Sequence, residues 1–137
     1  MKRALPYGDV VFYLGVFVYC LWHHRPGWQY LAGMALATVG YALWFTARAQ
    51  LGESFSPRAE ARELVTTGLY SKFRNPIYVF SALGMFSLCA AMGWYKFGGV
   101  YIVLVSIIQW WRAKKEAAVL EEKFGEKYRQ YRARTWF

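Results

Sequence analysis

The sequence predicts an all-α, polytopic membrane helix bundle with about four transmembrane helices and an amphipathic C-terminal helical extension. Hydrophobic residues make up 57% of the 137 residues and aromatic residues 20%, which is too apolar for an ordinary soluble domain of this length. Charged residues are also strongly segregated. None occurs in residues 10–22, 28–47, 75–95 or 97–111.

These four charge-free runs predict the helices of a single membrane domain covering residues 1–137. Because about 20 apolar residues cross the hydrocarbon core of a bilayer, the second and third runs are long enough unaided. The first run reaches that length only with residues 5–9, and the fourth only with the turn at 112–115. The predicted helices lie at about 7–23, 28–49, 75–95 and 97–123.

The distribution of Lys and Arg predicts the orientation of the bundle, because short basic loops stay in the cytoplasm. The amino terminus has two basic residues, the loop 48–74 has five and the tail 112–137 has eight, whereas the other two loops hold only Arg25 and Lys96. We therefore expect an integral, multi-pass protein of a bacterial inner membrane with both termini cytoplasmic. The net charge of +9 follows from this asymmetry and from contact with membrane lipids, so it does not indicate nucleic-acid binding.

Histidine and cysteine offer no metal site in this sequence. His23 and His24 are adjacent, in a turn with no Cys, Asp or Glu beside them to complete a coordination shell. Cys20 and Cys89 both lie inside apolar runs and suit small buried side chains. We expect neither a bound metal nor a disulfide framework.

The end of the central loop predicts a helix start at the cytoplasmic boundary. Gly68, after two threonines, predicts a turn with positive φ. Pro76 suits the first position of a helix and leaves Asn75 to cap it. The free backbone N–H groups there, with Lys72 and Arg74 nearby, favour a carboxylate or phosphate. The alternative is an ordinary capped membrane helix with basic anchors.

The carboxyl-terminal segment has helical spacing. One residue in every four forms a stripe on this helix, which starts with a basic residue and continues with large apolar ones. Glu116 is the one acidic residue of the stripe, and we expect it at the depth where the third helix begins. An acidic group in that position needs a partner, which makes Glu116 a candidate ligand for a cation. The alternative is an ion pair between Arg112 and Glu116 within the helix. The stripe consists of Arg112, Glu116, Leu120, Phe124 and Tyr128.

Two motifs together resemble a known family. The first is Leu-Val-Thr-x-Gly-x-Tyr followed by Phe-Arg-Asn-Pro-x-Tyr, and the second is Arg-x3-Glu-x3-Leu-x3-Phe-Gly-x2-Tyr-x2-Tyr. They are similar to the integral membrane methyltransferases grouped with isoprenylcysteine carboxyl methyltransferase and phospholipid N-methyltransferase. The resemblance covers residues 64–131, with the two motifs in the family's order and a hydrophobic hairpin between them.

The resemblance implies an S-adenosyl-L-methionine pocket on the cytoplasmic side, formed by the loop 48–74 and the tail 112–137. It implies that Arg112 faces the acceptor. Arg62 and Glu63 occupy two further positions that line the pocket in the family, although their residue types differ from the family's. Carried over position by position, the other cofactor-binding residues are Leu64, Val65, Tyr70, Asn75, Pro76, Ile77, Tyr78 and Glu116. No residue is assigned as a catalytic acid or base.

The sequence also departs from the family pattern. Asn75 stands where many members have His, which removes a group able to titrate but keeps one able to hydrogen-bond. Ala117 replaces a second Glu, and Phe80 replaces a small Gly. The number of helices is low for the family, so we expect the lipid-binding part either to be minimal or to be completed by a second copy of the chain in a homo-oligomer.

The expected function is an S-adenosylmethionine-dependent methyltransferase acting at the cytoplasmic membrane face. The acceptor is lipophilic or membrane-embedded, either an isoprenoid cysteine carboxylate or thiol, or a phospholipid amine. Two alternatives stay open. One is an NADPH enzyme similar to membrane sterol reductases, whose Arg-His-Pro-x-Tyr loop typically continues with Gly-Glu where this chain has Val79 and Phe80. The other is a non-catalytic membrane protein that retains the fold.

Overall fold

The computed structural model describes residues 8–52 and 64–136, and over these residues it is built from helices without a regular strand. The all-α prediction is therefore confirmed. Arg62 and Glu63 lie outside the described residues, as do the two basic residues at the amino terminus. The elements are α1 (Gly8–Trp22), α2 (Trp28–Leu51), the short 3-10 helix η2 (Gly68–Ser71), α3 (Pro76–Ala91), α4 (Tyr95–Phe124) and α5 (Glu126–Arg134).

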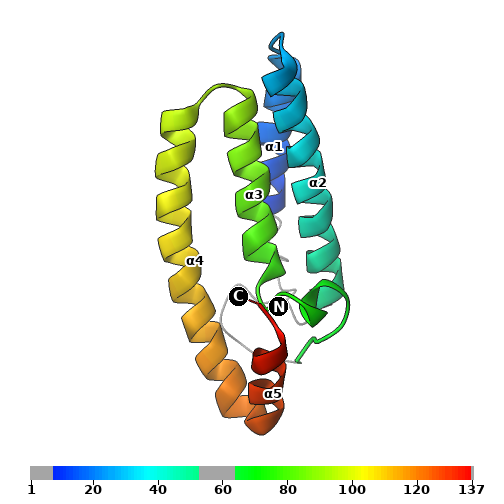
Figure 1. The fold of residues 1–137 in the computed structure, drawn as a ribbon, viewed down its shortest axis with the longest axis vertical. Helices are drawn as coiled ribbons and strands as arrows, with labels where there is room; N and C mark the ends of the chain where they lie inside the picture. The colour runs from blue at the N-terminus through cyan, green and yellow to red at the C-terminus, as the bar shows by residue number, and fades with distance from the viewer. Residues whose placement is uncertain (1–7, 53–63, 137) are drawn as a thin grey trace, which may run out of the picture.

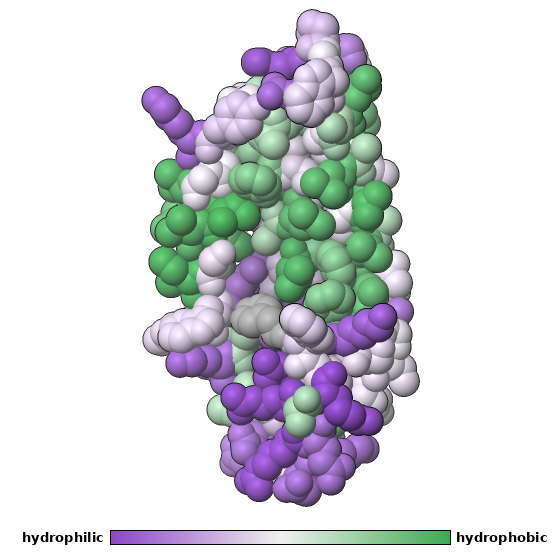
Figure 2. All heavy atoms as spheres, viewed as in Figure 1, coloured by the Kyte–Doolittle hydropathy of each residue, from purple (hydrophilic) through white to green (hydrophobic). Residues whose placement is uncertain are grey.

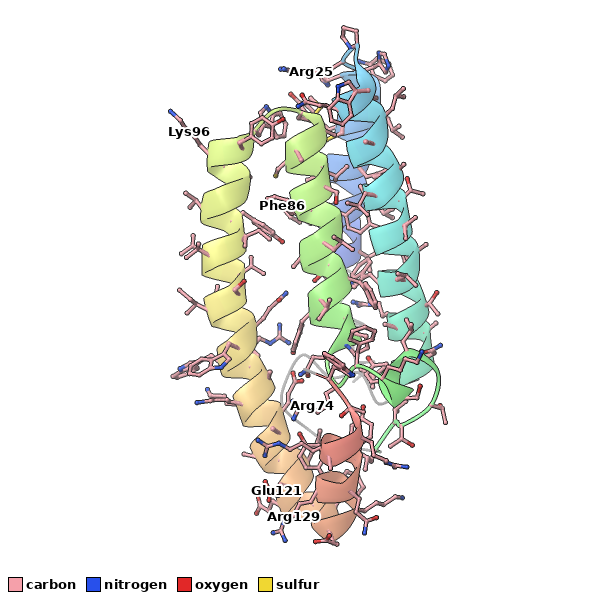
Figure 3. All side chains as sticks on the ribbon, viewed as in Figure 1. Arg25, Arg74, Phe86, Lys96, Glu121 and Arg129 are labelled. Atoms are coloured by element: carbon pink, nitrogen blue, oxygen red, sulfur yellow. The ribbon has the colours of Figure 1, made fainter. Side chains whose placement is uncertain are left out.

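Four long helices lie side by side along the long axis of the molecule, with α3 between α2 and α4 and α1 behind α3 (Figure 1). Arg25, in the turn before α2, and Lys96, at the beginning of α4, lie at one end, whereas Arg74, Glu121 and Arg129 lie at the other (Figure 3). Apolar side chains form a band over the middle and upper part of the bundle, and polar ones gather around α5 (Figure 2).

One helix among the described residues, α2, is long and apolar enough by itself to cross a membrane. Helices α1 and α3 are apolar but have 15 and 16 residues. Many large apolar side chains of α1 and α4 face outward, including Val11, Val18, Val103 and Ile107. Such an exposed apolar surface is typical of a chain that associates with membranes.

Small residues bring α2 and α3 into backbone contact. A Cβ added to Gly33 would lie 2.8 Å from the Cα of Ala91, and one added to Gly40 would lie 3.0 Å from the backbone nitrogen of Gly84. Larger residues there would push the two helices apart, whereas glycine lets dispersion contacts accumulate along them. Trp44 and Ala37 of α2 are almost completely buried beside this seam.

An ion pair fixes α1 to α2 at the polar end of the bundle. Arg48, near the end of α2, donates to the Asp9 carboxylate in the first turn of α1 and lies over the Trp44 ring. Asp9 is also well placed at a helix amino terminus, where the helix dipole favours negative charge.

The carboxyl-terminal extension of α4 is not one continuous helix. The prediction that Tyr128 shares a continuous helical stripe with Arg112 is wrong, because α4 ends at Phe124 and Gly125 adopts φ 51°. Glycine enters this left-handed region without a Cβ penalty. The chain then turns back as α5, beside the end of α4 (Figure 1). This reversal directs Tyr128 and Tyr131 into the interior, where both are buried.

Candidate functional site

The loop before α3 is held from one side by α2. Gly68 has φ 62°, as the sequence predicts, and the side chain of Gln50 packs where a Cβ would stand. The Gln50 side-chain oxygen accepts a hydrogen bond from the Leu69 backbone N–H at 2.8 Å. This contact begins η2, in which Tyr70 is buried.

The tail holds the same loop from the other side. The Tyr131 hydroxyl donates to the carbonyl oxygen of Tyr70 at 2.7 Å. Trp136 forms a parallel bridge with Phe73: its N–H donates to the Lys72 carbonyl oxygen at 2.7 Å, and its own carbonyl oxygen accepts from the Arg74 N–H at 2.8 Å. Burial raises the pKa of Tyr131 to about 12, so this hydroxyl keeps its proton at neutral pH and remains a donor.

Helix α3 begins at the predicted residues but without the predicted side-chain cap. Pro76 is its first residue, and the Asn75 carbonyl oxygen accepts the first bonds of the helix, from Tyr78 and Val79. The Asn75 side chain makes no cap hydrogen bond. Its backbone, with φ −127° and ψ 57°, lies outside the β region usual for a capping residue.

Three side chains of the candidate site meet between α3 and α4. The Tyr78 hydroxyl donates to the Glu116 carboxylate, and the Arg112 guanidinium lies 5.3 Å from the centre of the Tyr78 ring. No ion pair between Arg112 and Glu116 occurs in this described part of the chain. Tyr78 therefore contacts both charged side chains, and its hydrogen bond to Glu116 crosses the seam between α3 and α4.

The Glu116 carboxyl is desolvated. Burial raises the pKa of Glu116, while the hydrogen bond from Tyr78 and the positive charge of Arg112 oppose that rise. Tyr70 lies on the same side of the site, since burial and then the nearby Tyr131, Glu116 and Tyr78 raise the pKa of its hydroxyl. A carboxylate in such surroundings gains strongly from a cation placed against it.

Arg74 brings a positive group to the amino end of α3. Its Nε is buried and has no hydrogen-bond partner among the described residues. Burial raises the pKa of Tyr128, and the charges of Arg74 and Arg132 oppose that rise, which places Arg74 between α3 and α5. A buried guanidinium N–H without an acceptor is costly, so an anion at this point would be stabilised.

The sequence-predicted site residues that the structure describes occupy one end of the bundle, but only some of them are in contact. Tyr78, Arg112 and Glu116 form the cluster described above, and Tyr70 lies close to it. Arg62 and Glu63 fall outside the described residues. Leu64, Val65, Asn75 and Ile77 are half-buried, and Pro76 is buried. No hydrogen bond joins the Asn75 side chain to the Tyr78, Arg112 and Glu116 side chains among the residues that the structure describes.

Sequence reasoning missed two contributors to the site. Trp136 holds the loop beside Tyr131, the last residue of the second motif, and the Phe-Gly pair is the signal for the break at Gly125 that positions both. Gln109, which appears in the sequence only as a polar residue in an apolar run, donates a 3.4 Å hydrogen bond to Ser81 across the α3–α4 seam.

The residues present fit the groups of S-adenosylmethionine. That cofactor has a cationic sulfonium, a carboxylate and an adenine. Glu116 supplies a desolvated negative charge, Arg74 supplies an unsatisfied buried donor beside the start of α3, and Tyr70 and Tyr78 supply aromatic surfaces. Each group of the cofactor thus has a complementary side chain at this end of the bundle.

Comparison with known proteins agrees with the motifs. The model of the phospholipid methyltransferase family matches residues 28–127, which include α2, η2, α3 and α4 and exclude α1. No curated protein matches the chain. Because the family model covers well over half of the sequence and includes the Tyr78, Arg112 and Glu116 cluster, the chain belongs to the phospholipid methyltransferase family and is a membrane-associated methyltransferase for a lipid-related substrate.

Proposed function

We propose that this protein transfers a methyl group from S-adenosylmethionine to a lipophilic acceptor at the cytoplasmic membrane face. The observation that carries the proposal is the cluster of Tyr78, Arg112 and Glu116, which places a desolvated carboxylate across the α3–α4 seam with no ion-pair partner on its own helix. Such a carboxylate suits a cationic cofactor.

When bound, S-adenosylmethionine supplies a methyl group on a positively charged sulfur, and the sulfur becomes neutral once the methyl has left. Glu116 would hold the cationic part, while Arg74 and the backbone N–H of Ile77 would hold the carboxylate, because Pro76 has no N–H and the Tyr78 and Val79 N–H groups already donate to Asn75. Tyr70, which keeps its proton, would contribute ring surface and a hydrogen-bond donor. Because this transfer needs little covalent assistance, alignment of acceptor and methyl in a dry site would provide most of the rate acceleration.

Arg112 would face the acceptor. It lies 5.3 Å from the centre of the Tyr78 ring, directly after the charge-free run 97–111, and a cation in this position can bind a carboxylate or phosphate of a lipid head group. This position suits either class of acceptor named above, an isoprenoid cysteine carboxylate or thiol, or a phospholipid amine.

The topology proposed with this function is a single four-span domain with both termini and the loop 48–74 in the cytoplasm. Support comes from the distribution of basic residues and from the arrangement of the helices, which puts Arg25 and Lys96 at the end opposite Arg74 and Arg129 (Figure 3). Reporter fusions at Gly27 and after Phe137 test it. A cytoplasmic signal from the Gly27 fusion would exclude this topology.

Isothermal titration of the detergent-purified protein with S-adenosylmethionine and, separately, with NADPH tests the function. We expect saturable binding of the first and none of the second. NADPH binding alone would support a reductase, and binding of neither would support a non-catalytic protein that keeps the fold.

A further inference from the structure

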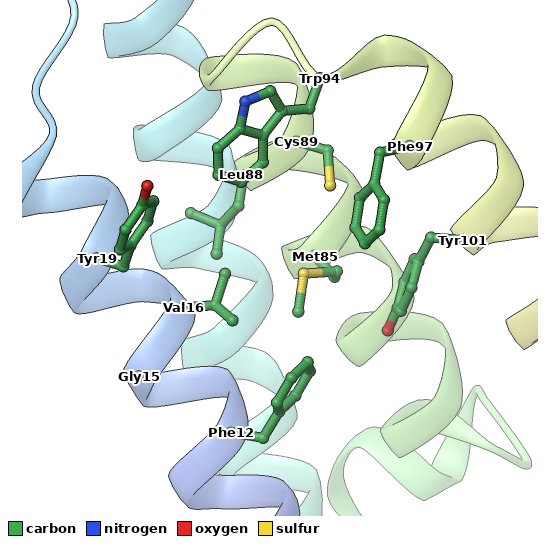
Figure 4. Close-up of a pocket in the computed structure, with 10 residues that line it drawn as sticks. All are labelled: Phe12, Gly15, Val16, Tyr19, Met85, Leu88, Cys89, Trp94, Phe97 and Tyr101. Atoms are coloured by element: carbon green, nitrogen blue, oxygen red, sulfur yellow. The ribbon is translucent and has the colours of Figure 1, made fainter.

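A cavity lies in the half of the bundle farther from the cluster of Tyr78, Arg112 and Glu116. It has a volume of about 410 Å³ and lies between α1, α3 and the beginning of α4. Figure 4 shows side chains from all three helices around a common space. Its lining includes Gly15 and Val16 of α1, Met85 and Leu88 of α3, and Phe97 and Tyr101 of α4.

Gly15 leaves room in the wall of this cavity. A Cβ added to Gly15 would meet no atom within 4 Å, in contrast to the close approach at Gly33. The lining is almost entirely apolar, and the cavity has the size of sites that enclose small apolar ligands. Helix α1, which forms one wall, lies outside the residues matched by the family model.

One face of α4 joins this cavity to the candidate site. Tyr101, Val105, Gln109, Arg112 and Glu116 follow one another at helical spacing, and each is only half-buried. Tyr101 lines the cavity, and Glu116 belongs to the cluster. Helix α4 therefore presents an incompletely packed stripe that leads from the site to the cavity.

The distance along α3 between the cluster and the cavity sets the length of a ligand that would occupy both. Tyr78 and Met85 are seven residues apart and Tyr78 and Cys89 eleven, which is about 10 to 16 Å along a helix. One leaflet of the hydrocarbon core is about 15 Å deep. A chain of lipid length attached to a polar group beside Arg112 would thus end in the cavity.

We propose that this cavity binds one hydrocarbon chain, acyl or prenyl, which is the apolar tail of the methyl acceptor. The inference rests on the proposed function, because it places the reacting end of the acceptor beside Arg112 and Glu116. It assigns to the acceptor a single long chain that lies along the half-buried face of α4, and it gives α1 a role in selecting that chain.

Trp94 lines the cavity and provides a reporter. The protein is placed in nanodiscs of unlabelled phosphatidylcholine and phosphatidylglycerol and titrated with dibrominated stearic acid, whose bromines quench nearby tryptophan. The Trp94 contribution is the difference between the wild type and Trp94→Phe. We expect saturable quenching of that contribution.

Gly15→Leu and Gly99→Leu form a matched pair of variants. Both glycines lie in helices, and at each of them a Cβ would enter open space. Leucine is also the better helix former, so both variants should fold. Only Gly15 lines the cavity. Gly15→Leu should lose the saturable quenching, and Gly99→Leu should keep it.

A second arm replaces the fatty acid with dibrominated phospholipid in the nanodisc, to separate the acceptor's tail from bulk lipid. Equal quenching of Trp94 by bulk phospholipid, unchanged in Gly15→Leu, would overturn the proposal.

Titration of the same samples with S-adenosylmethionine keeps the two proposals separate. Normal cofactor binding without saturable quenching would contradict only the proposed hydrocarbon-chain site. Saturable quenching without cofactor binding would contradict the proposed function.

Discussion

The two sides of α3 are packed in opposite ways. Toward α2, glycine and alanine bring the helix backbones together at Gly33 and Ala91 and again at Gly40 and Gly84. Toward α4, the glycine that comes close is Gly98, which meets the side chain of Cys89 and not its backbone. Further along α4 the contacts are polar and sparse, with Gln109 donating to Ser81 and Tyr78 donating to Glu116.

The difference indicates that the α2–α3 seam is a scaffold and that the α3–α4 seam can hold a reaction site. A seam of small residues gains its stability from many dispersion contacts and leaves no room for a ligand. A seam held by a few polar side chains can part, and its hydroxyl, guanidinium and carboxyl groups are then free to bind a substrate. The four predictions below test that division.

The largest effect is expected in the α2–α3 seam. Gly33→Leu forces a side chain into the backbone of Ala91, so we expect a loss of about 3 kcal/mol in the free energy of unfolding, the upper end of the usual range for overpacking. Gly99→Leu is the control, because its side chain enters open space. Denaturant titration of both variants in detergent measures the difference, and equal stability of the two would mean that α2 and α3 are not closely packed.

In the α3–α4 seam, Glu116→Gln should affect binding instead of stability. Loss of a charge-assisted contact should weaken S-adenosylmethionine binding by about 1 to 3 kcal/mol, while the protein remains folded and membrane-inserted. Glu122→Gln provides the control, since Glu122 is exposed on the same helix. Titration calorimetry decides the outcome. Unchanged affinity in Glu116→Gln would restrict Glu116 to its contact with Tyr78.

The raised pKa of Glu116 predicts two pH dependences of opposite sign. As pH falls through this pKa, the carboxylate gains a proton and its attraction for a cation is lost, so cofactor affinity should fall. In the cofactor-free protein, the native state binds that proton more tightly than the unfolded state, so this residue's contribution to stability should grow over the same interval. Affinity and unfolding measured across pH, with Glu116→Gln subtracted, should show both trends, and two trends of the same sign would refute the assignment.

The smallest effect on stability is expected at Asn75. Because its side chain does not cap α3, Asn75→Ala should change the free energy of unfolding by no more than about 0.5 kcal/mol. If Asn75 hydrogen-bonds the cofactor, the same variant should weaken S-adenosylmethionine binding by about 1 kcal/mol, and Asn75→His should retain binding. Thermal unfolding and calorimetry on the same samples distinguish the two effects. A stability loss without an affinity loss would make Asn75 purely structural.

The helices were predictable because charge-free runs and Pro76 mark them directly, and the amino end of α3 falls at the proline. The site was predictable only as a set of residues. That Tyr78 bonds Glu116 depends on the register between α3 and α4, which no local pattern contains. The side-chain cap at Asn75 was not formed because the loop, held by Trp136, sets a backbone angle that local propensity does not determine. Tyr128 leaves the periodic stripe because Gly125 adopts a positive φ and ends α4 before the last repeat.

The single buried residue of α4, Gly98, has a mechanical consequence. All of α4 is described, and near one end its backbone comes close to the Cys89 side chain of α3, so the helix resembles a lever with its pivot at Gly98. The arm from Gly98 to Glu116 is eighteen residues, about 27 Å, and a tilt of about 10° would carry the carboxylate about 5 Å. Admission of a bulky ligand would then require a change of angle at one glycine, with every helix intact.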